Sequence, residues 1–223
     1  MSALVPAQAL HFSGPAGTLE GLIESPMDGP LLLGAVICHP HPLYGGSLHN
    51  KVVHTLARAL GAGGAGTLRF NFRGVGASSG QFDGGLGETD DTLAAAALVR
   101  ERWPNAPLVL AGFSFGGAVA LRAAAQVRPD WLILVAPAIE RVPLDKLSPP
   151  TYPWLVVQGE ADEVVSADSV RQWLAGLTPR APPQLCLLAG VGHFFHGQLH
   201  TLRDCLATHW PRSLPHRRSS PET

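Results

Sequence analysis

Short apolar runs alternate with amphipathic segments along most of the chain. Six of these runs have the character of buried strands, at residues 31–40, 65–72, 107–114, 131–138, 153–159 and 184–190. Five segments with helical periodicity lie between or after them, at residues 49–62, 88–103, 115–126, 167–177 and 198–210. This alternation predicts a mostly parallel sheet with helices on both faces.

The first part of the chain follows a different pattern. Two short runs within residues 10–25 are joined by Gly14 to Gly17, which predicts an antiparallel hairpin. Together with the six apolar runs, this hairpin predicts an α/β fold with a sheet of about eight strands. We find no internal repeat and no linker, and therefore expect a single domain over residues 1–210. Residues 211–223 have the proline, serine and charge content of a flexible tail.

A Gly-x-Ser-x-Gly pentapeptide, from Gly112 to Gly116, stands between a strand pattern and an alanine-rich helix pattern. In that context Ser114 would occupy a sharp strand-to-helix turn with a strained backbone. Glycine is the residue that tolerates the crowding at the two flanking positions, Gly112 and Gly116. The motif predicts a nucleophilic serine; the alternative is an ordinary glycine turn.

A nucleophilic serine needs a base and an acid that orients it, which in this context follow the serine in the order acid, then histidine. The run at 153–159 leads into a loop that holds Asp162, and the run at 184–190 leads into one that holds His193. Both loops follow strand carboxyl ends and should lie on the same rim as Ser114. We prefer Asp162 to its neighbours Glu160 and Glu163, and His193 to His196. The alternatives are a solvated loop acid and a surface histidine.

These residues resemble those of the α/β-hydrolases, specifically the small bacterial serine hydrolases related to dienelactone hydrolases. Three further stretches carry the resemblance, which covers nearly the whole chain: His39 to Gly46, Phe70 to Gly80 and Gly87 to Asp91. The resemblance implies an α/β-hydrolase fold and a catalytic triad of Ser114, Asp162 and His193. The dienelactone hydrolases have a cysteine nucleophile where this chain has serine, so their substrate is not carried over.

Acyl transfer also needs two backbone N–H donors for the negative oxygen of the tetrahedral intermediate. Phe115, which follows the serine, is the first expected donor. The second should lie in the loop after the first apolar run, where Pro40 and Pro42 have no N–H to donate. His41 is then the first choice and Leu43 the second.

Other residues are assigned supporting roles. Tyr44, Phe113 and Phe194 are candidates for the substrate pocket, and the Tyr44 hydroxyl is a further candidate for contact with the oxyanion. The resemblance implies that Arg73 braces the oxyanion loop. His39 and His41 are spaced like a pair of metal ligands, but no carboxylate or cysteine stands at ligand spacing nearby, so we expect no metal and no cofactor.

Composition is that of a globular enzyme. Of the 223 residues, 46% are hydrophobic and 15% charged, and the net charge of −1 argues against nucleic-acid or anionic-membrane partners. The amino terminus lacks the pattern of a secretory signal, and no apolar run is long enough to span a membrane. Cys38, Cys186 and Cys205 lie in apolar patterns, which predicts buried free thiols in a reducing compartment. We therefore expect a cytoplasmic protein.

The expected activity is hydrolysis of small carboxylic esters. Many hydrolases of this class carry a cap at the position of Glu140 to Tyr152, but this segment is too short to form a helical lid. An open site for short-chain esters follows. Thioesterase, lactonase or perhydrolase activity would use the same residues, and a binding protein that has lost turnover is the third hypothesis.

Overall fold

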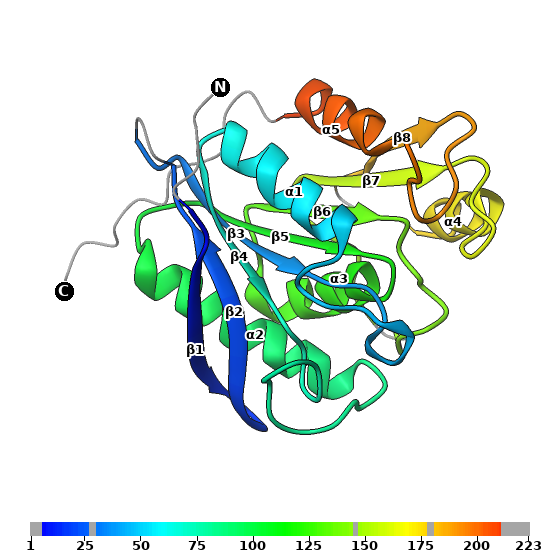
Figure 1. Cartoon of the computed structure of the whole chain (residues 1–223). Coiled ribbons are helices and arrows are strands. Elements are labelled where there is room, and N and C mark those ends of the chain that lie inside the picture. The colour runs from blue at the N-terminus through cyan, green and yellow to red at the C-terminus, as the bar shows by residue number, and fades with distance from the viewer. Residues whose placement is uncertain (1–5, 27–29, 145–146, 178–180, 211–223) are drawn as a thin grey trace.

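The computed structural model describes residues 6–26, 30–144, 147–177 and 181–210. These residues form one eight-stranded sheet in the order β1-β2-β4-β3-β5-β6-β7-β8, flanked by helices (Figure 1). The strands are β1 (Gln8–Gly14), β2 (Gly17–Glu24), β3 (Leu33–Cys38), β4 (Ala65–Phe70), β5 (Leu108–Phe113), β6 (Trp131–Val135), β7 (Trp154–Gly159) and β8 (Gln184–Leu188). The helices are α1 (Lys51–Ala62), α2 (Leu86–Arg102), α3 (Phe115–Val127), α4 (Ala167–Ala175) and α5 (Leu199–Thr208), with a short 3₁₀ turn η1 (Pro42–Tyr44).

The strand directions are those expected from the sequence. Strands β3 to β8 run parallel, whereas β1 and β2 form an antiparallel hairpin that joins the sheet through antiparallel pairing of β2 with β4. The mostly parallel sheet and the opening hairpin are thereby confirmed. Since β3, β5, β6, β7 and β8 all point the same way, the loops that follow them gather at one edge of the sheet.

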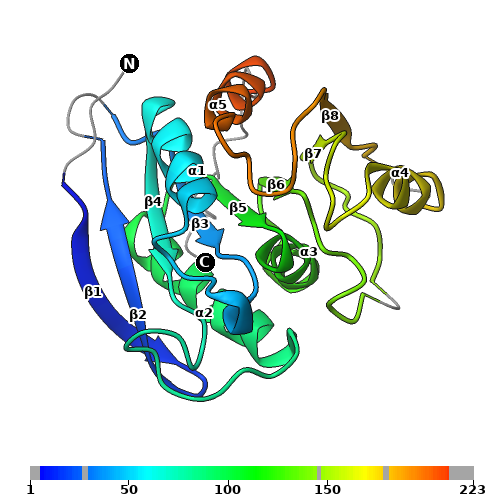
Figure 2. The same ribbon diagram turned by 45° about the vertical axis from the view of Figure 1, so that its right-hand side comes forward.

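Helices cover both faces of the sheet (Figure 2). Helices α1 and α5 pack on one face, over an apolar cluster that includes Val53, Leu56 and Leu202. Helices α2, α3 and α4 pack on the other face, over a cluster that includes Val99 and Val119. Because the strands between these layers are covered on both sides, β3 to β7 are buried at every position.

Strand β8 departs from the expectation of six fully buried strands. It lies at the edge of the sheet and pairs only with β7, so Gln184 is exposed and the rest of the strand is half-buried. Local capping also moves the start of α1. The Asn50 side chain accepts the Val52 N–H at 2.9 Å, so α1 begins at Lys51 rather than at residue 49.

The β6–β7 connection carries no helix or strand in its described part, which leaves the carboxyl edge of the sheet without a cap. The tail expected at 211–223 lies outside the described residues. Within the part of the chain that the structure describes, no helix is long and apolar enough to cross a membrane.

The expectation of three free thiols is wrong for two of them. Cys186 of β8 and Cys205 of α5 form a disulfide, 19 residues apart in sequence, and only Cys38 is a buried free cysteine. The disulfide links edge strand β8 to helix α5 and joins two cysteines that no local spacing relates. Burial raises the pKa of the Cys38 thiol to about 12, so this thiol remains protonated and inert at neutral pH.

Reduction of the disulfide is expected to destabilise the protein. Closing a loop of this length restricts the unfolded chain, and the chain-entropy model gives about 3 kcal/mol for it. Guanidinium unfolding with and without a dithiol reductant, both with a metal chelator present, measures the difference. An unchanged free energy of unfolding would contradict the prediction.

Candidate active site

Ser114 occupies a strained turn between β5 and α3. Its backbone has φ 56° and ψ −119°, a conformation that non-glycine residues rarely adopt. Main-chain hydrogen bonds hold the turn: the Ser114 N–H donates to Val135 O at 2.8 Å, and its carbonyl accepts the Ala138 N–H at 3.0 Å. A Cβ at Gly112 would overlap the Gly116 carbonyl, and one at Gly116 would overlap the His39 carbonyl. Both positions therefore require glycine.

The structure brings the three predicted triad residues together in one hydrogen-bonded chain. His193 Nε2 lies 3.0 Å from Ser114 Oγ, and His193 Nδ1 lies 2.8 Å from Asp162 Oδ2. The imidazole is 3% exposed. Because a carboxylate can only accept, Nδ1 carries the proton toward Asp162, and Nε2 presents its lone pair to the serine hydroxyl. The loops after β5, β7 and β8 supply these residues from the same edge of the sheet.

Asp162 is held by donors on both carboxylate oxygens. Oδ1 accepts the main-chain N–H groups of Val164 and Val165 at 2.9 and 2.7 Å. Oδ2 accepts from His193 and from Gln158 Nε2, the latter at 3.0 Å. Burial alone would raise the pKa of Asp162, but the hydrogen bonds from His193 and the two amides outweigh it and lower this pKa below its ordinary value. The carboxylate is therefore ionised at neutral pH.

The neighbouring acids and the second histidine occupy other positions. Glu163 Oε2 accepts the His193 main-chain N–H at 3.2 Å, so this acid fixes the loop and does not contact the imidazole ring nitrogens. Glu160 pairs with Arg171 at 3.0 Å on the surface. His196 is exposed and its ring packs against Phe194.

A pocket with a volume of about 230 Å³ opens beside Ser114. Its walls come from the 3₁₀ turn, the start of α3, the segment after β6 and the segment that leads into α4. The lining residues are His41, Tyr44, Ser114, Phe115, Ala138, Ile139, Glu140, Arg141, Val164, Val165, Ser166 and Ser169.

Of the three expected pocket residues, only Tyr44 lines this space. Phe113 is 1% exposed and its ring lies under the His193 imidazole, with 5.1 Å between centroids. Phe194 is 50% exposed and makes an edge-on ring contact with His193, with 5.1 Å between centroids. Both aromatics support the imidazole and neither lines the pocket, because Phe113 belongs to a buried strand and Phe194 faces outward.

Phe115 and His41 both line this pocket, and their main-chain N–H groups are the candidates for the oxyanion hole. Phe115 is the first residue of α3, and the first N–H groups of a helix have no acceptor within it. His41 lines the pocket, and its N–H has no acceptor among the described residues. The Leu43 N–H donates to His41 Nδ1 at 3.3 Å, so the second choice already has a partner.

His39 ties the loop that holds His41, the candidate second oxyanion donor, to the segment after β4, a role that the sequence did not reveal. The Phe72 N–H donates to His39 Nε2 at 3.1 Å, and His39 Nδ1 lies 2.6 Å from Pro40 O. The imidazole is fully buried, and this desolvation lowers its pKa to about 4. Arg73, expected to brace this loop, instead forms a two-pronged pair with Asp91 of α2, at 2.8 and 3.0 Å. The link between the loop and β4 therefore runs through His39.

Because the His39 imidazole is buried, we expect the protein to lose stability at pH values well above those at which carboxylates titrate. The unfolded chain binds a proton at His39 below pH 6.5, whereas the folded protein resists it until about pH 4, so stability falls as pH drops through this window. The expected loss is about 2 kcal/mol between pH 7 and pH 5. Urea unfolding at both pH values measures it. His39→Gln, which retains an acceptor for Phe72, should lose less over the same interval; equal losses in both proteins would refute the assignment.

Comparisons with known proteins define the class of this fold and site. Residues 36–151 match the family described as serine aminopeptidase, S33. The chain is 43% identical to XC6422 from Xanthomonas campestris, an α/β serine hydrolase without a lid; the match covers 96% of this chain and 100% of that one, with a TM-score of 0.86. It is also 35% identical, over 83% of this chain and 81% of the relative, to the uncharacterized protein RP471 of Rickettsia prowazekii.

The chain therefore belongs to the α/β serine hydrolases, and the prediction of a lidless member is confirmed. A dienelactone hydrolase from Anabaena variabilis shares the fold, with a TM-score of 0.77 at 19% identity over 94% of this chain and 98% of that one. The matched family region contains Ser114 but ends before Asp162 and His193. The acid and the base are thus assigned by geometry and chain order.

Proposed function

We propose that this protein is a serine esterase that hydrolyses small carboxylic esters through an acyl-enzyme on Ser114. The observation that carries the proposal is the chain of hydrogen bonds from Ser114 Oγ through His193 to Asp162, at 3.0 and 2.8 Å, beside an open pocket. A serine hydroxyl is a weak nucleophile, and a neutral imidazole within hydrogen-bonding distance is the base that activates it.

In the proposed reaction, His193 Nε2 takes the hydroxyl proton as Ser114 Oγ attacks the ester carbonyl. Asp162 holds the Nδ1 proton and stabilises the imidazolium that forms. The imidazolium then protonates the leaving alcohol, which departs and leaves the acyl group on Ser114. A water molecule deprotonated by His193 attacks the acyl-enzyme, and the released acid regenerates the free serine.

The main-chain N–H groups of Phe115 and His41 are the proposed donors to the tetrahedral oxyanion. A donor that is already aimed at this oxygen stabilises the transition state without reorganisation during the reaction. Burial, and to a smaller extent the positive charge of Arg141, lower the pKa of His41. The His41 side chain beside the proposed oxyanion donor is therefore a neutral imidazole.

Labelling with a fluorophosphonate tests the nucleophile directly. The probe should modify one serine per chain, and peptide mapping should locate the adduct on Ser114. Labelling should be lost in His193→Gln, in which no base activates the hydroxyl. An adduct on another serine, or unreactive folded protein, would overturn the proposal.

Pocket size predicts a preference for short acyl chains. About 230 Å³ is below the roughly 300–1,000 Å³ of pockets that enclose drug-sized ligands. We expect kcat/KM to be highest for acetate or butyrate esters and to fall for long-chain esters, without activation at lipid interfaces. A panel graded by chain length, with a matched thioester, lactone and amide, measures this preference and separates ester hydrolysis from the related reactions. Faster turnover of long-chain triglycerides would contradict it.

A further inference from the structure

Two cysteine sulfurs, joined here as a disulfide, and an imidazole nitrogen meet between β8 and the end of α5. The Sγ atoms of Cys186 and Cys205 and a ring nitrogen of His209 all lie within 4.8 Å of one another. His209 Nδ1 is 3.7 Å from Cys205 Sγ and 2.9 Å from the Cys205 carbonyl oxygen. Among the residues that the structure describes, this is the only group of three or more cysteine, histidine or acidic side chains with metal-binding spacing.

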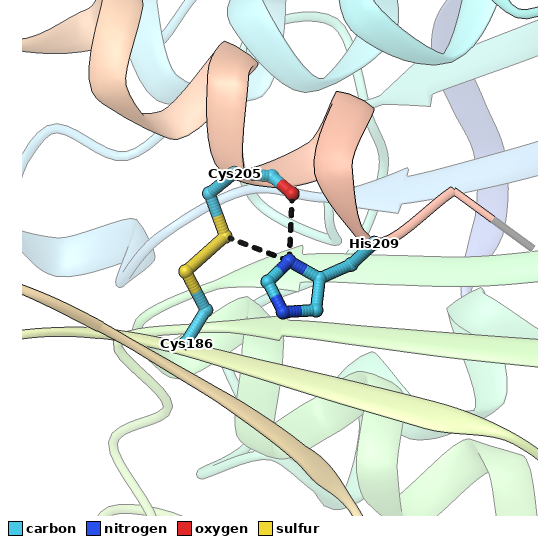
Figure 3. A group of neighbouring side chains, drawn as sticks. All are labelled: Cys186, Cys205 and His209. Atoms are coloured by element: carbon cyan, nitrogen blue, oxygen red, sulfur yellow. Dashed lines mark hydrogen bonds between the residues drawn. A yellow bond between two sulfur atoms is a disulfide. The ribbon is translucent and has the colours of Figure 1, made fainter.

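The fold itself explains why these side chains converge. Cys205 and His209 are four residues apart, so they project from the same side of α5 and its carboxyl end. Cys186 stands in the middle of β8 and meets them from the sheet (Figure 3). Cys205 is buried and the other two are half-buried. The sulfur atoms thus approach from two different elements, with the imidazole beside them.

We propose that this cluster is a redox-controlled metal site. In the oxidised protein the sulfurs are joined as the disulfide seen here; in the reduced protein, Cys186 Sγ, Cys205 Sγ and His209 Nδ1 bind one Zn²⁺-like cation. Two thiolates and an imidazole form the type of donor set that selects Zn²⁺ over hard cations such as Mg²⁺ and Ca²⁺.

A cavity reaches the histidine of the cluster, although neither cysteine lines it. His209 lines a cavity of about 500 Å³, together with Gln184 and Thr208 and with Trp131 and Trp154 from the amino ends of β6 and β7. Zn²⁺ sites with three protein ligands complete their tetrahedron with water or another small ligand. This cavity gives solvent access to the imidazole side of the site.

The chemistry balances with a dithiol as the reductant. Two thiol–disulfide exchanges break the Cys186–Cys205 bond, yield two thiols and leave the reductant as a cyclic disulfide. Metal binding then releases two protons, one from each thiol. His209 currently directs Nδ1 at a carbonyl oxygen, which requires an Nδ1–H; to bind the cation, the ring moves this proton to Nε2 and offers the Nδ1 lone pair.

The position of the site links it to the proposed catalytic base. Cys186 and Cys205 bracket residues 187–204, and this segment contains His193. Either the disulfide or a shared cation closes the segment into a loop, whereas the reduced metal-free protein leaves its two ends joined only by packing. The ends of this segment are therefore linked in the disulfide form and in the metal-bound form, and unlinked in the reduced metal-free form.

Cobalt and zinc titrations of the full chain test the proposal. The dithiol-reduced protein, freed of excess reductant under anaerobic conditions, should bind one equivalent of Co²⁺ with thiolate charge-transfer absorption and tetrahedral visible bands, and Zn²⁺ should displace it. The oxidised protein should show neither. Cys186→Ser and Cys205→Ser should each abolish the charge-transfer signal at one equivalent of Co²⁺. His209→Ala should weaken metal binding by more than the roughly 10–100-fold loss that follows removal of a residue that only hydrogen-bonds to a metal ligand.

Matched controls separate this site from adventitious binding. Cys38→Ala removes the third thiol and His200→Ala removes an exposed histidine of the same helix, and both should bind as the wild type does. In the reduced wild type, Zn²⁺ should protect Cys186 and Cys205 from alkylation. This measurement does not depend on the folding of any variant. Absence of the Co²⁺ thiolate signal in reduced wild type, its persistence in Cys186→Ser, or unprotected cysteines would overturn the proposal.

Discussion

Replacing Ser114 by alanine is expected to lower kcat for a short-chain ester by on the order of 10⁶-fold. The substitution removes the only hydroxyl within hydrogen-bonding distance of His193 Nε2 among the described residues. It leaves the pocket and the candidate oxyanion donors in place, so residual turnover should reflect binding and oxyanion stabilisation alone. Steady-state rates with an activated acetate ester measure the loss, and the burst of leaving group should disappear with it.

Ser169→Ala is the matched control for this experiment. Ser169 lines the same pocket but makes no hydrogen bond to the triad, so its loss should change KM more than kcat. The Ser114→Ala variant is expected to stay folded, because alanine has the same Cβ as serine at this strained position and the turn is held by main-chain bonds to Val135 and Ala138. A Ser114→Ala protein that keeps a tenth of the wild-type kcat would exclude this serine as the nucleophile.

Asp162→Asn should lower kcat by about 10⁴-fold while the fold is retained. The amide oxygen can still accept from Val164 and Val165, which turns the NH₂ group toward His193. His193 Nδ1 must then accept, so its proton moves to Nε2 and the imidazole can no longer receive the serine proton. Gln158 Nε2 donates to Val165 O at 2.8 Å as well as to Asp162, so it retains an acceptor in this variant.

The comparison for Asp162→Asn is Glu163→Gln. The glutamine oxygen keeps an acceptor for the His193 main-chain N–H, so this variant should retain most of its kcat. Steady-state rates measured as a function of pH, together with near-ultraviolet circular dichroism, separate a wrong tautomer from a disturbed loop. Similar rates in both variants would show that the negative charge on Asp162 has no special role.

Local motifs carried most of what the sequence could predict. The strand runs, the hairpin and the glycine-flanked turn are each encoded within a few residues, and parallel strands necessarily place Ser114, Asp162 and His193 at one edge. Side-chain direction is not encoded this way. Phe113 and Phe194 adjoin the triad in sequence, but one belongs to a buried strand and the other faces outward, so sequence proximity gave the wrong pocket residues.

The residues that support the triad and its loops are harder to predict from the sequence. Gln158 is a polar residue in an otherwise apolar strand run, and this exception was the available sign of its bond to Asp162. His39 follows a buried strand directly, but only the position of Phe72 on the neighbouring strand end reveals its acceptor role. The pairing of Cys186 with Cys205 depends on how α5 lies against β8, which no spacing rule specifies.

The hydrogen bond from the Ala138 N–H to the Ser114 carbonyl ties the nucleophile's turn to the strip of chain that walls the pocket. Redesign of acyl selectivity can therefore proceed by exchanging side chains at Ile139 to Arg141, which follow the anchored residue Ala138. Grafting a lid into this enzyme calls for an insertion point beyond Arg141, where added residues would not pull on the serine.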